Sequence, residues 1–259
     1  MTLRRLLEGE GGPERHFPES WSQGRATFGG LVVGAAVAEL RRQVAPERRL
    51  RVVQALFAGP VPPGDALVTS EILREGRSMT LAEARVWSND SARVVVSAGF
   101  GLSRESALSG ACEVMPDWSA PGQCPPMPYV QGLTPEFTRH CRMVFCEGQV
   151  PFSASTQSSH GGWTCIPDEA GDLDEALLVA MLDIWPCPVL QRSQWPHPAS
   201  TVAWQITLHE VPRTPADGWY AYRSVEESTE DGYHAFRASM WDADGRLLAT
   251  CHQQVAVFG

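Results

Sequence analysis

Hydrophobic and polar residues are arranged in the same way in two long parts of the chain. Residues 28–44 are apolar on nearly every side until Glu39, and this pattern predicts a buried helix. The small residues at 34–36 would let another backbone approach this helix closely. Alternating patterns separated by turn residues then predict strands at 51–57, 67–73, 80–87 and 93–100.

The same order of elements returns after residue 170. Acidic residues at 172, 174 and 175 predict the start of a second apolar helix, which we expect to reach Asp183 and stop before Pro186. Strands are predicted at 201–209, 219–226, 233–241 and 247–258. A buried helix followed by consecutive antiparallel strands is an α+β pattern, unlike the alternating order of a Rossmann fold.

Short motifs support a duplicated domain. A Trp, Asp and Arg recur in equivalent hairpins, and each half closes on Phe-Gly, at 100–101 and 258–259. Residues 103–134 are rich in Ser, Pro and Gly, which is typical of a connection. We therefore expect an N-terminal domain at 1–110, a linker at 111–134 and a C-terminal domain at 135–259. Within the last, 136–170 predict one or two strands around a polar stretch at 153–162.

Composition excludes several classes of protein. The net charge of -9 argues against non-specific nucleic-acid binding, which depends on Lys and Arg neutralising phosphates. No apolar run is long enough for a signal peptide or a membrane helix, so we expect a cytoplasmic protein without a membrane partner. Seven scattered cysteines argue against a disulfide framework. The spacing of nearby histidines and cysteines fits no standard zinc site, so no metal is expected: His140, Cys141, Cys146, His160 and Cys165.

Asp183 is the first candidate for chemistry. At helical spacing it shares a face with Ala176, Val179 and Ala180, which places a carboxylate near the core. Burial raises the pKa of a carboxyl group, and such a group can serve as a general base for water. The alternative is a residue past the last turn that points into solvent. Glu39 is followed by two arginines, so for this acid we predict a solvated surface position.

Polar residues on two predicted strands are further candidates. Thr201 opens the strand after the second helix and could equally be an ordinary strand residue. Gln253 and Gln254 are adjacent in the last strand, so alternation turns one of them inward. An inward glutamine in a core strand needs partners for its amide.

Taken in order, several segments resemble the bacterial acyl-CoA thioesterase II family, which consists of double-hotdog proteins. No single motif is specific, but their order and spacing are similar to the family over most of the chain outside 103–170. The segments are 28–34, 57–64, 73–78, 182–186, 200–202 and 245–253.

The resemblance implies two tandem hotdog domains, each a central helix wrapped by an antiparallel sheet. It also implies that Asp183, Thr201 and Gln253 hold and activate one water, which attacks the thioester of an acyl-CoA without a cofactor. Gly29 and Gly30 would supply oxyanion donors at a helix N-terminus, while Arg77 and Ser78 would contact the CoA phosphates. One working site per chain, a role in fatty acid metabolism and a homo-oligomer are expected.

Two other functions remain open from the sequence. His16-Phe17-Pro18 is partly similar to a motif of hotdog dehydratases, which suggests a dehydratase or hydratase. A non-catalytic protein that binds acyl-CoA or an acyl carrier could also use this fold. Ala203 stands where the family often has an acid, and Trp204 and Gln205 are also unusual there. These departures concern the substrate pocket, and the acyl chain length is not predicted.

Overall fold

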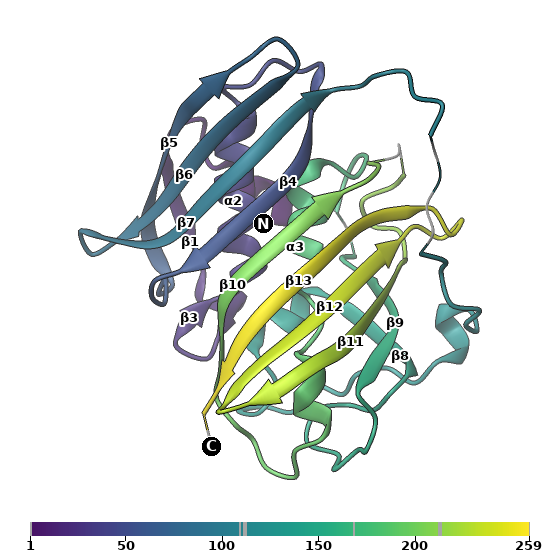
Figure 1. Cartoon of the computed structure of the whole chain (residues 1–259). Helices are drawn as coiled ribbons and strands as arrows, with labels where there is room; N and C mark the ends of the chain where they lie inside the picture. Colours follow the sequence, from purple (N-terminus) through teal and green to yellow (C-terminus); the bar gives the residue numbers. More distant parts are fainter. Residues whose placement is uncertain (1, 109, 111–112, 168, 212–213, 259) are drawn as a thin grey trace.

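The computed structural model describes residues 2–108, 110, 113–167, 169–211 and 214–258, and its first half is built around one central helix (Figure 1). A short helix α1 (Leu3–Glu8) precedes the central helix α2 (Gly29–Arg41). The strands of this half are β1 (Glu14–Phe17), the short pair β2 (Ser22–Gln23) and β3 (Ala26–Thr27), β4 (Arg48–Phe57), β5 (Gly64–Glu75), β6 (Met79–Ser88) and β7 (Ser91–Leu102).

The second half repeats this plan with a shorter helix. Its central helix is α3 (Glu175–Met181), whose first turn is capped by the Asp174 carboxylate, which accepts the Leu177 N–H at 2.9 Å. Its strands are β8 (Arg142–Glu147), β9 (Ser159–Cys165), β10 (Ala199–Leu208), β11 (Tyr220–Glu230), β12 (Tyr233–Trp241) and β13 (Leu247–Val257). Short 3-10 turns are η1 (Glu19–Trp21), η2 (Pro121–Gln123), η3 (Glu136–His140) and η4 (Pro188–Gln191).

One antiparallel sheet runs through both halves. Its eleven strands follow the order β1-β5-β6-β7-β4-β10-β13-β12-β11-β9-β8. Reading outward from the central pair β4–β10, the two sides match strand for strand as far as β1 and β9. Gln54 of β4 pairs with Gln205 of β10 at the centre of this arrangement. The duplicated sequence therefore folds as two equivalent units joined edge to edge.

The helices form the core on one face of this sheet. Every residue of α2 from Gly30 to Leu40 is buried, which explains why its sequence is apolar on all sides. Helix α2 packs beside α3 with close approaches at two glycines: a Cβ on Gly30 would overlap the Ala180 carbonyl oxygen, and a Cβ on Gly34 would lie 3.0 Å from the Ala176 carbonyl oxygen. The small residues predicted to permit a close helix contact do so in the structure.

The linker covers the opposite face of the second half. Trp118 lies against Gly161, and the Trp163 indole donates to the Ser119 carbonyl at 2.9 Å. A small second cluster of buried residues forms there: Val144, Trp163, Ala221, Trp241 and Leu247. A disulfide joins Cys124 to Cys146 in β8, with a Cα–Cα distance of 5.6 Å. The scattered cysteines thus include one bonded pair, although the sequence argued against a disulfide framework.

The eight strands predicted from alternation are confirmed, as are the two buried helices. Three details differ. Helix α1 was not predicted, and helix α3 ends at Met181 instead of Asp183. The polar stretch at 153–162 is partly a strand, since β9 begins at Ser159. Packing on both faces of β9 outweighs its weak strand composition.

Glu39 corrects a further expectation. It is only 8 % exposed and not a solvated surface residue. Its carboxylate accepts a hydrogen bond from buried Arg15 at 2.9 Å and another from Arg42 at 3.1 Å. Arg15 comes from β1, whose pairing with the sheet could not be predicted from four residues, so the partner of Glu39 was missed.

Domain boundaries at 110 and 134 remain a prediction, and the first of them falls beside residues 111–112, outside the described part of the chain. Residues 212–213 and Gly259, the last residue of the second Phe-Gly pair, also lie outside the described residues. Across the described residues, no helix is both long and apolar enough to pass through a membrane.

Candidate active site

Asp183 lies just beyond the end of α3, where the chain turns away from the helix. Its side chain is half-buried, and its Oδ1 accepts a hydrogen bond from Nε2 of Gln253 at 2.8 Å. The alternative of a freely solvated carboxylate past the last turn is therefore wrong. The two residues come from the turn after α3 and from β13, which are far apart in sequence and meet on the inner face of the sheet.

The surroundings of Asp183 change its acidity. Burial among neighbouring atoms raises the pKa of its carboxyl group to about 6, while the Gln253 amide and the Gly30 N–H act in the opposite direction. Although the carboxyl group is strongly desolvated, part of the side chain remains accessible. A carboxylate with this pKa is ionised at neutral pH and is a stronger base than an exposed aspartate.

Gln253 is the inward member of the glutamine pair. It is 8 % exposed and pairs across the sheet with Trp204, whereas Gln254 is exposed on the outer face. This settles which glutamine turns toward the helices. Its amide donates to Asp183, so the partner that a buried glutamine requires is the candidate carboxylate.

Thr201 reaches the same face through a β-bulge. The register of β10 against β13 shifts between Thr201 and Ala203, so that Thr201 pairs with Val255 and Trp204 with Gln253. Val255 and Gln253 share the inner face, and directly paired residues point to the same side. Without the bulge, Thr201 and Trp204 would face opposite ways. Thr201 is thus a diagonal neighbour of Gln253, and no hydrogen bond joins the two side chains within the described residues.

The N-terminus of α2 completes these surroundings. A Cβ on Gly29 would lie 2.8 Å from Oδ2 of Asp183, and a Cβ on Gly30 would overlap the Ala180 carbonyl oxygen of α3. Glycine at both positions lets the helix start approach the carboxylate. The first N–H groups of a helix have no partner inside the helix and carry a partial positive charge, so they suit a developing oxyanion.

The equivalent position in the first half lacks these groups. Strand β4 has the same bulge, between Leu50 and Val52. By register, Leu50 corresponds to Thr201, and Ala98, which pairs with Val53, corresponds to Gln253. The two helices also have equivalent ends: the end of α3 lies beside the start of α2, and the end of α2 lies beside the start of α3. The first of these places holds Asp183, whereas in the second Arg41 lies 3.5 Å from Glu175. One hydroxyl–amide–carboxylate set is therefore present per chain among the described residues.

Arg77 and Ser78 lie away from Asp183. They form the turn between β5 and β6, beside Arg48 at the start of β4. Phe57, at the other end of β4, packs near Gly29. The length of β4 therefore separates this turn from Asp183, roughly 30 Å at the usual rise per strand residue. The structure does not bring these two residues together with the carboxylate.

The residues of the other motifs are dispersed. His16 is exposed at the sheet edge, where its Nδ1 lies 2.7 Å from Oδ1 of Asp65, so the dehydratase motif has no buried site. His140 stacks on Trp21 at a ring distance of 4.5 Å, and Cys146 belongs to the disulfide. The grouped histidines and cysteines of the sequence therefore do not form one cluster.

Sequence reasoning missed the aromatic and thiol neighbours of Asp183. Burial raises the pKa of the Tyr222 hydroxyl and of the Cys187 and Cys251 thiols, and the negative charge of nearby Asp183 raises each pKa further. Trp185 stacks on Tyr222 with ring centroids 5.5 Å apart. Trp185 and Cys187 follow Asp183 by two and four residues, whereas Tyr222 and Cys251 come from β11 and β13. No local pattern could have identified these two distant residues.

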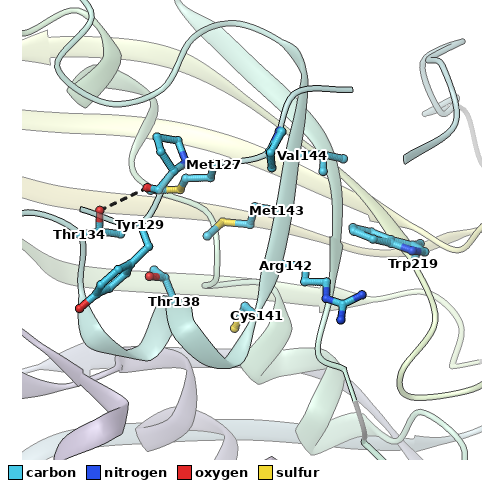
Figure 2. Close-up of a pocket in the computed structure, with 11 residues that line it drawn as sticks. Met127, Tyr129, Thr134, Thr138, Cys141, Arg142, Met143, Val144 and Trp219 are labelled. Atoms are coloured by element: carbon cyan, nitrogen blue, oxygen red, sulfur yellow. Dashed lines mark hydrogen bonds between the residues drawn. The ribbon is translucent and has the colours of Figure 1, made fainter. Parts of the chain in front are cut away.

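Two cavities lie elsewhere on the molecule. The first, of about 310 Å³, is shown in Figure 2, and its lining includes Met127, Tyr129, Thr134, Thr138 and Met143. The second, of about 810 Å³, lies between α1, the end of α2 and the start of α3. Neither is lined by Asp183, Gln253 or Thr201, so both are separate from the candidate site.

Family models match both halves of the chain. The model described as the acyl-CoA thioesterase C-terminal domain matches residues 121–257, and the corresponding N-terminal domain model matches 17–101. No curated protein sequence matches the chain.

Solved structures with similar folds agree with the expected architecture. A conserved protein of unknown function with a hot dog fold from Alicyclobacillus acidocaldarius has a TM-score of 0.86 at 21% identity, covering 99% of this chain and 98% of that one. An acyl-CoA thioesterase II, TesB2, from Mycobacterium marinum has a TM-score of 0.75 at 15% identity, covering 100% and 99%. A tesB protein from Mycobacterium avium subs paratuberculosis has a TM-score of 0.77 at 16% identity, covering 99% and 98%.

These structural matches confirm the double-hotdog α+β fold, with two central helices on one continuous sheet. The C-terminal domain model alone spans more than half of the sequence. With both domain models matched in order along one chain, the protein belongs to the acyl-CoA thioesterase family.

Proposed function

We propose that this protein hydrolyses acyl-CoA thioesters to a free acid and CoA, using the site around Asp183. The observation that carries the proposal is the hydrogen bond between Asp183 and Gln253 at 2.8 Å, on a carboxylate whose pKa is raised to about 6. Family membership supports the reaction class. The residue roles below rest on the geometry and on the resemblance.

In this mechanism Asp183 is the general base. Its carboxylate takes a proton from one water, and the resulting hydroxide attacks the thioester carbon. The Gln253 amide fixes the carboxylate, and the Thr201 hydroxyl on the same inner face helps to direct the water. The tetrahedral oxyanion is stabilised by N–H groups at the start of α2 that Asp183 leaves free, beside Gly29, because the Gly30 N–H already donates to the carboxylate. Its collapse breaks the C–S bond and releases the CoA thiolate, which takes the proton held by Asp183 and so restores the carboxylate. No cofactor takes part in these steps.

Hydrolysis of an acyl-CoA panel from acetyl to palmitoyl, followed by thiol release, tests this function. Wild-type turnover on some member, reduced by a factor of about 10² or more in Asp183→Asn, is the expected result for loss of a general base. Exposed Asp244 provides the matched control, because Asp244→Asn removes the same charge away from the site. Full turnover in Asp183→Asn would disprove the role of Asp183. Binding without turnover would instead favour an acyl-CoA binding protein.

A homo-oligomer is part of the same proposal. The outer face of the first half, unlike the linker-covered second half, exposes several leucines: Leu56, Leu67, Leu73 and Leu81. Exposed apolar groups on a sheet favour association with another surface. Sedimentation equilibrium tests this directly, and a single species with the mass of one chain at micromolar concentration would contradict it.

A further inference from the structure

The proposed site is accessible from the place where β4 ends and β10 begins. Its partly exposed residues gather there: Gly29, Phe57, Asp183 and Thr201. CoA is large and highly charged, and burying its charges would be costly, so its arm must leave the site on this side. The acyl chain lies on the other side of the thioester carbon. It is therefore directed inward, along the inner face of β10.

Trp204 is the next inward-facing residue after Thr201 on β10. The bulge between Thr201 and Ala203 puts both side chains on the same face, where Trp204 pairs with Gln253 of β13. On its other side Trp204 pairs with Ala55 of β4, and the tryptophan is only 2 % exposed. An acyl chain that passes Thr201 along this face meets the side chain of Trp204 first.

The indole of Trp204 extends to the interior side of Asp183 and Gln253. Cys251 is the inward residue of β13 one step deeper than Gln253. Burial raises the pKa of the Cys251 thiol to about 12, the indole N–H of Trp204 lowers it, and the charge of Asp183 raises it further. Both groups therefore lie near this thiol. The indole occupies the space that a longer acyl chain would have to enter.

Rings also fill the inner face on the other side of Gln253. Phe236 of β12 pairs directly with Gln253 and is 2 % exposed. Beyond it, Trp185 stacks on Tyr222 with ring centroids 5.5 Å apart and meets His160 edge-on at 5.6 Å. These side chains are packed against one another, so a chain deflected from Trp204 toward β12 meets further aromatic residues.

The first half carries a smaller residue at the equivalent position. Ala98 corresponds to Gln253 and pairs with Val53, so Val53 corresponds to Trp204. Val53 is fully buried as well, which shows that this place in the fold accepts a side chain of either size. The larger residue stands in the half that carries Asp183 and Gln253, as expected if its size limits what binds there.

We propose that Trp204 limits the length of the acyl chain and makes short acyl-CoA thioesters, such as acetyl-CoA and butyryl-CoA, the preferred substrates. The inference rests on the proposed thioester hydrolysis and adds a substrate class to it. A buried ring in a close-packed interior yields little space, so each further methylene must displace it or turn back toward solvent. One methylene too many in such a place costs about tenfold or more in kcat/KM.

The test compares kcat/KM for the better of acetyl-CoA and butyryl-CoA with that for octanoyl-CoA. In the wild type we expect the short substrate to be favoured by about tenfold or more. Trp204→Val matches the size of Val53 and should lower this ratio by about tenfold or more, and Trp204→Phe should give an intermediate value. Trp241→Val is the control, because it shortens an equally large buried side chain on the opposite, linker-covered face, and it should keep the wild-type ratio.

A wild type that hydrolyses octanoyl-CoA as well as the short substrates would overturn the proposal, as would an unchanged ratio in Trp204→Val. Trp204→Phe, the smaller change, decides the matter if thermal unfolding shows that Trp204→Val does not fold.

If no acyl-CoA is hydrolysed, the proposed function fails, and the role of Trp204 is tested separately by calorimetry with non-hydrolysable thioether analogues of butyryl-CoA and octanoyl-CoA. Tighter binding of the butyryl analogue to the wild type, with a gain of about tenfold for the octanoyl analogue in Trp204→Val, supports the proposal. Equal binding of the two analogues, or binding of neither, overturns it.

Discussion

Gln253 and Asp183 are 70 residues apart in the chain, and the glutamine amide donates a hydrogen bond of 2.8 Å to the carboxylate. The pair joins the last strand to the turn after α3. Because the amide donates to Oδ1, Oδ2 remains directed toward the start of α2, where it lies beside Gly29. The orientation of the proposed base is thus set by two elements that the sequence separates widely.

The pH dependence of turnover should report the pKa of Asp183. A general base must be deprotonated, so kcat/KM should rise about tenfold per pH unit below about pH 6 and level off above it, because burial raises that pKa to about 6. Rates measured from pH 4.5 to 9 with buffers of constant ionic strength would check this. A profile that is flat through pH 6 would contradict the assignment of the base.

Protein stability should change with pH in the opposite direction. The carboxyl group of Asp183 has a pKa of about 6 in the folded protein against 3.8 for the unperturbed group, so the folded state holds its proton more tightly. Its contribution to stability is therefore greatest below about pH 4 and declines as the pH rises through 6. Asp183→Asn removes this decline. The free energy of unfolding of the variant, measured relative to that of wild type, should therefore rise by about 1–3 kcal/mol between pH 4 and pH 8.

Urea unfolding of both proteins across this range measures the difference. The Asp244→Asn control should follow the wild type at every pH. If the Asp183→Asn curve also ran parallel to wild type, the carboxylate would not be desolvated as the structure indicates.

The two glycines at the start of α2 should respond differently to alanine. Gly29→Ala places a methyl group 2.8 Å from Oδ2 of Asp183, a side chain that can shift, so activity should fall tenfold or more while stability changes little. Gly30→Ala meets the Ala180 backbone, which cannot move freely, and should cost about 1–3 kcal/mol of stability. Thermal unfolding and kcat measured on both variants separate the two effects. Equal losses of stability would contradict this distinction.

The hydroxyl of Thr201 should matter more than its methyl group. Thr201→Val keeps the shape of the side chain at the bulge but removes the group proposed to direct the water, so kcat should drop about tenfold. Thr201→Ser keeps the hydroxyl and should retain most of the activity. Full activity in Thr201→Val would leave Thr201 as a structural strand residue, the alternative that the sequence left open.

Arg77 tests the remaining assignment from the resemblance. Binding of a CoA phosphate would make Arg77→Ala raise KM about tenfold with kcat unchanged, as expected for loss of a charged contact. Since Arg77 lies at the far end of β4 from Asp183, we expect a change of less than twofold. Arg74→Ala, which changes an exposed arginine near the end of β5, is the control.

The sequence was sufficient for the framework of the fold because that framework rests on local patterns. The all-apolar helix at 28–44 and the alternating strands between 51 and 100 and between 201 and 258 each carry their own period. Helix α1 and strand β1 have six and four residues, too few for a period, and they are stabilised by distant partners such as Glu169 and β5. Such elements could not be predicted without tertiary contacts.

The site was partly accessible for the same reason. Asp183 stood out as an acid beside an apolar helix, and alternation required one of two glutamines to turn inward. The orientation of Thr201 depends on a one-residue bulge, and the neighbours Tyr222 and His160 depend on the register of β11 and β9. Register between strands that are distant in sequence is not encoded in any single segment.

Direct pairing of β4 with β10 affects what a break in the linker would do. Five residue pairs and the α2–α3 contact hold the halves together, and neither depends on the segment after Leu102. A chain nicked there would stay assembled as a complex of two fragments. A single half, by contrast, would expose β4 or β10 as an edge strand that can pair with a strand of another chain. The fused halves thus behave as a dimer whose two subunits are covalently linked.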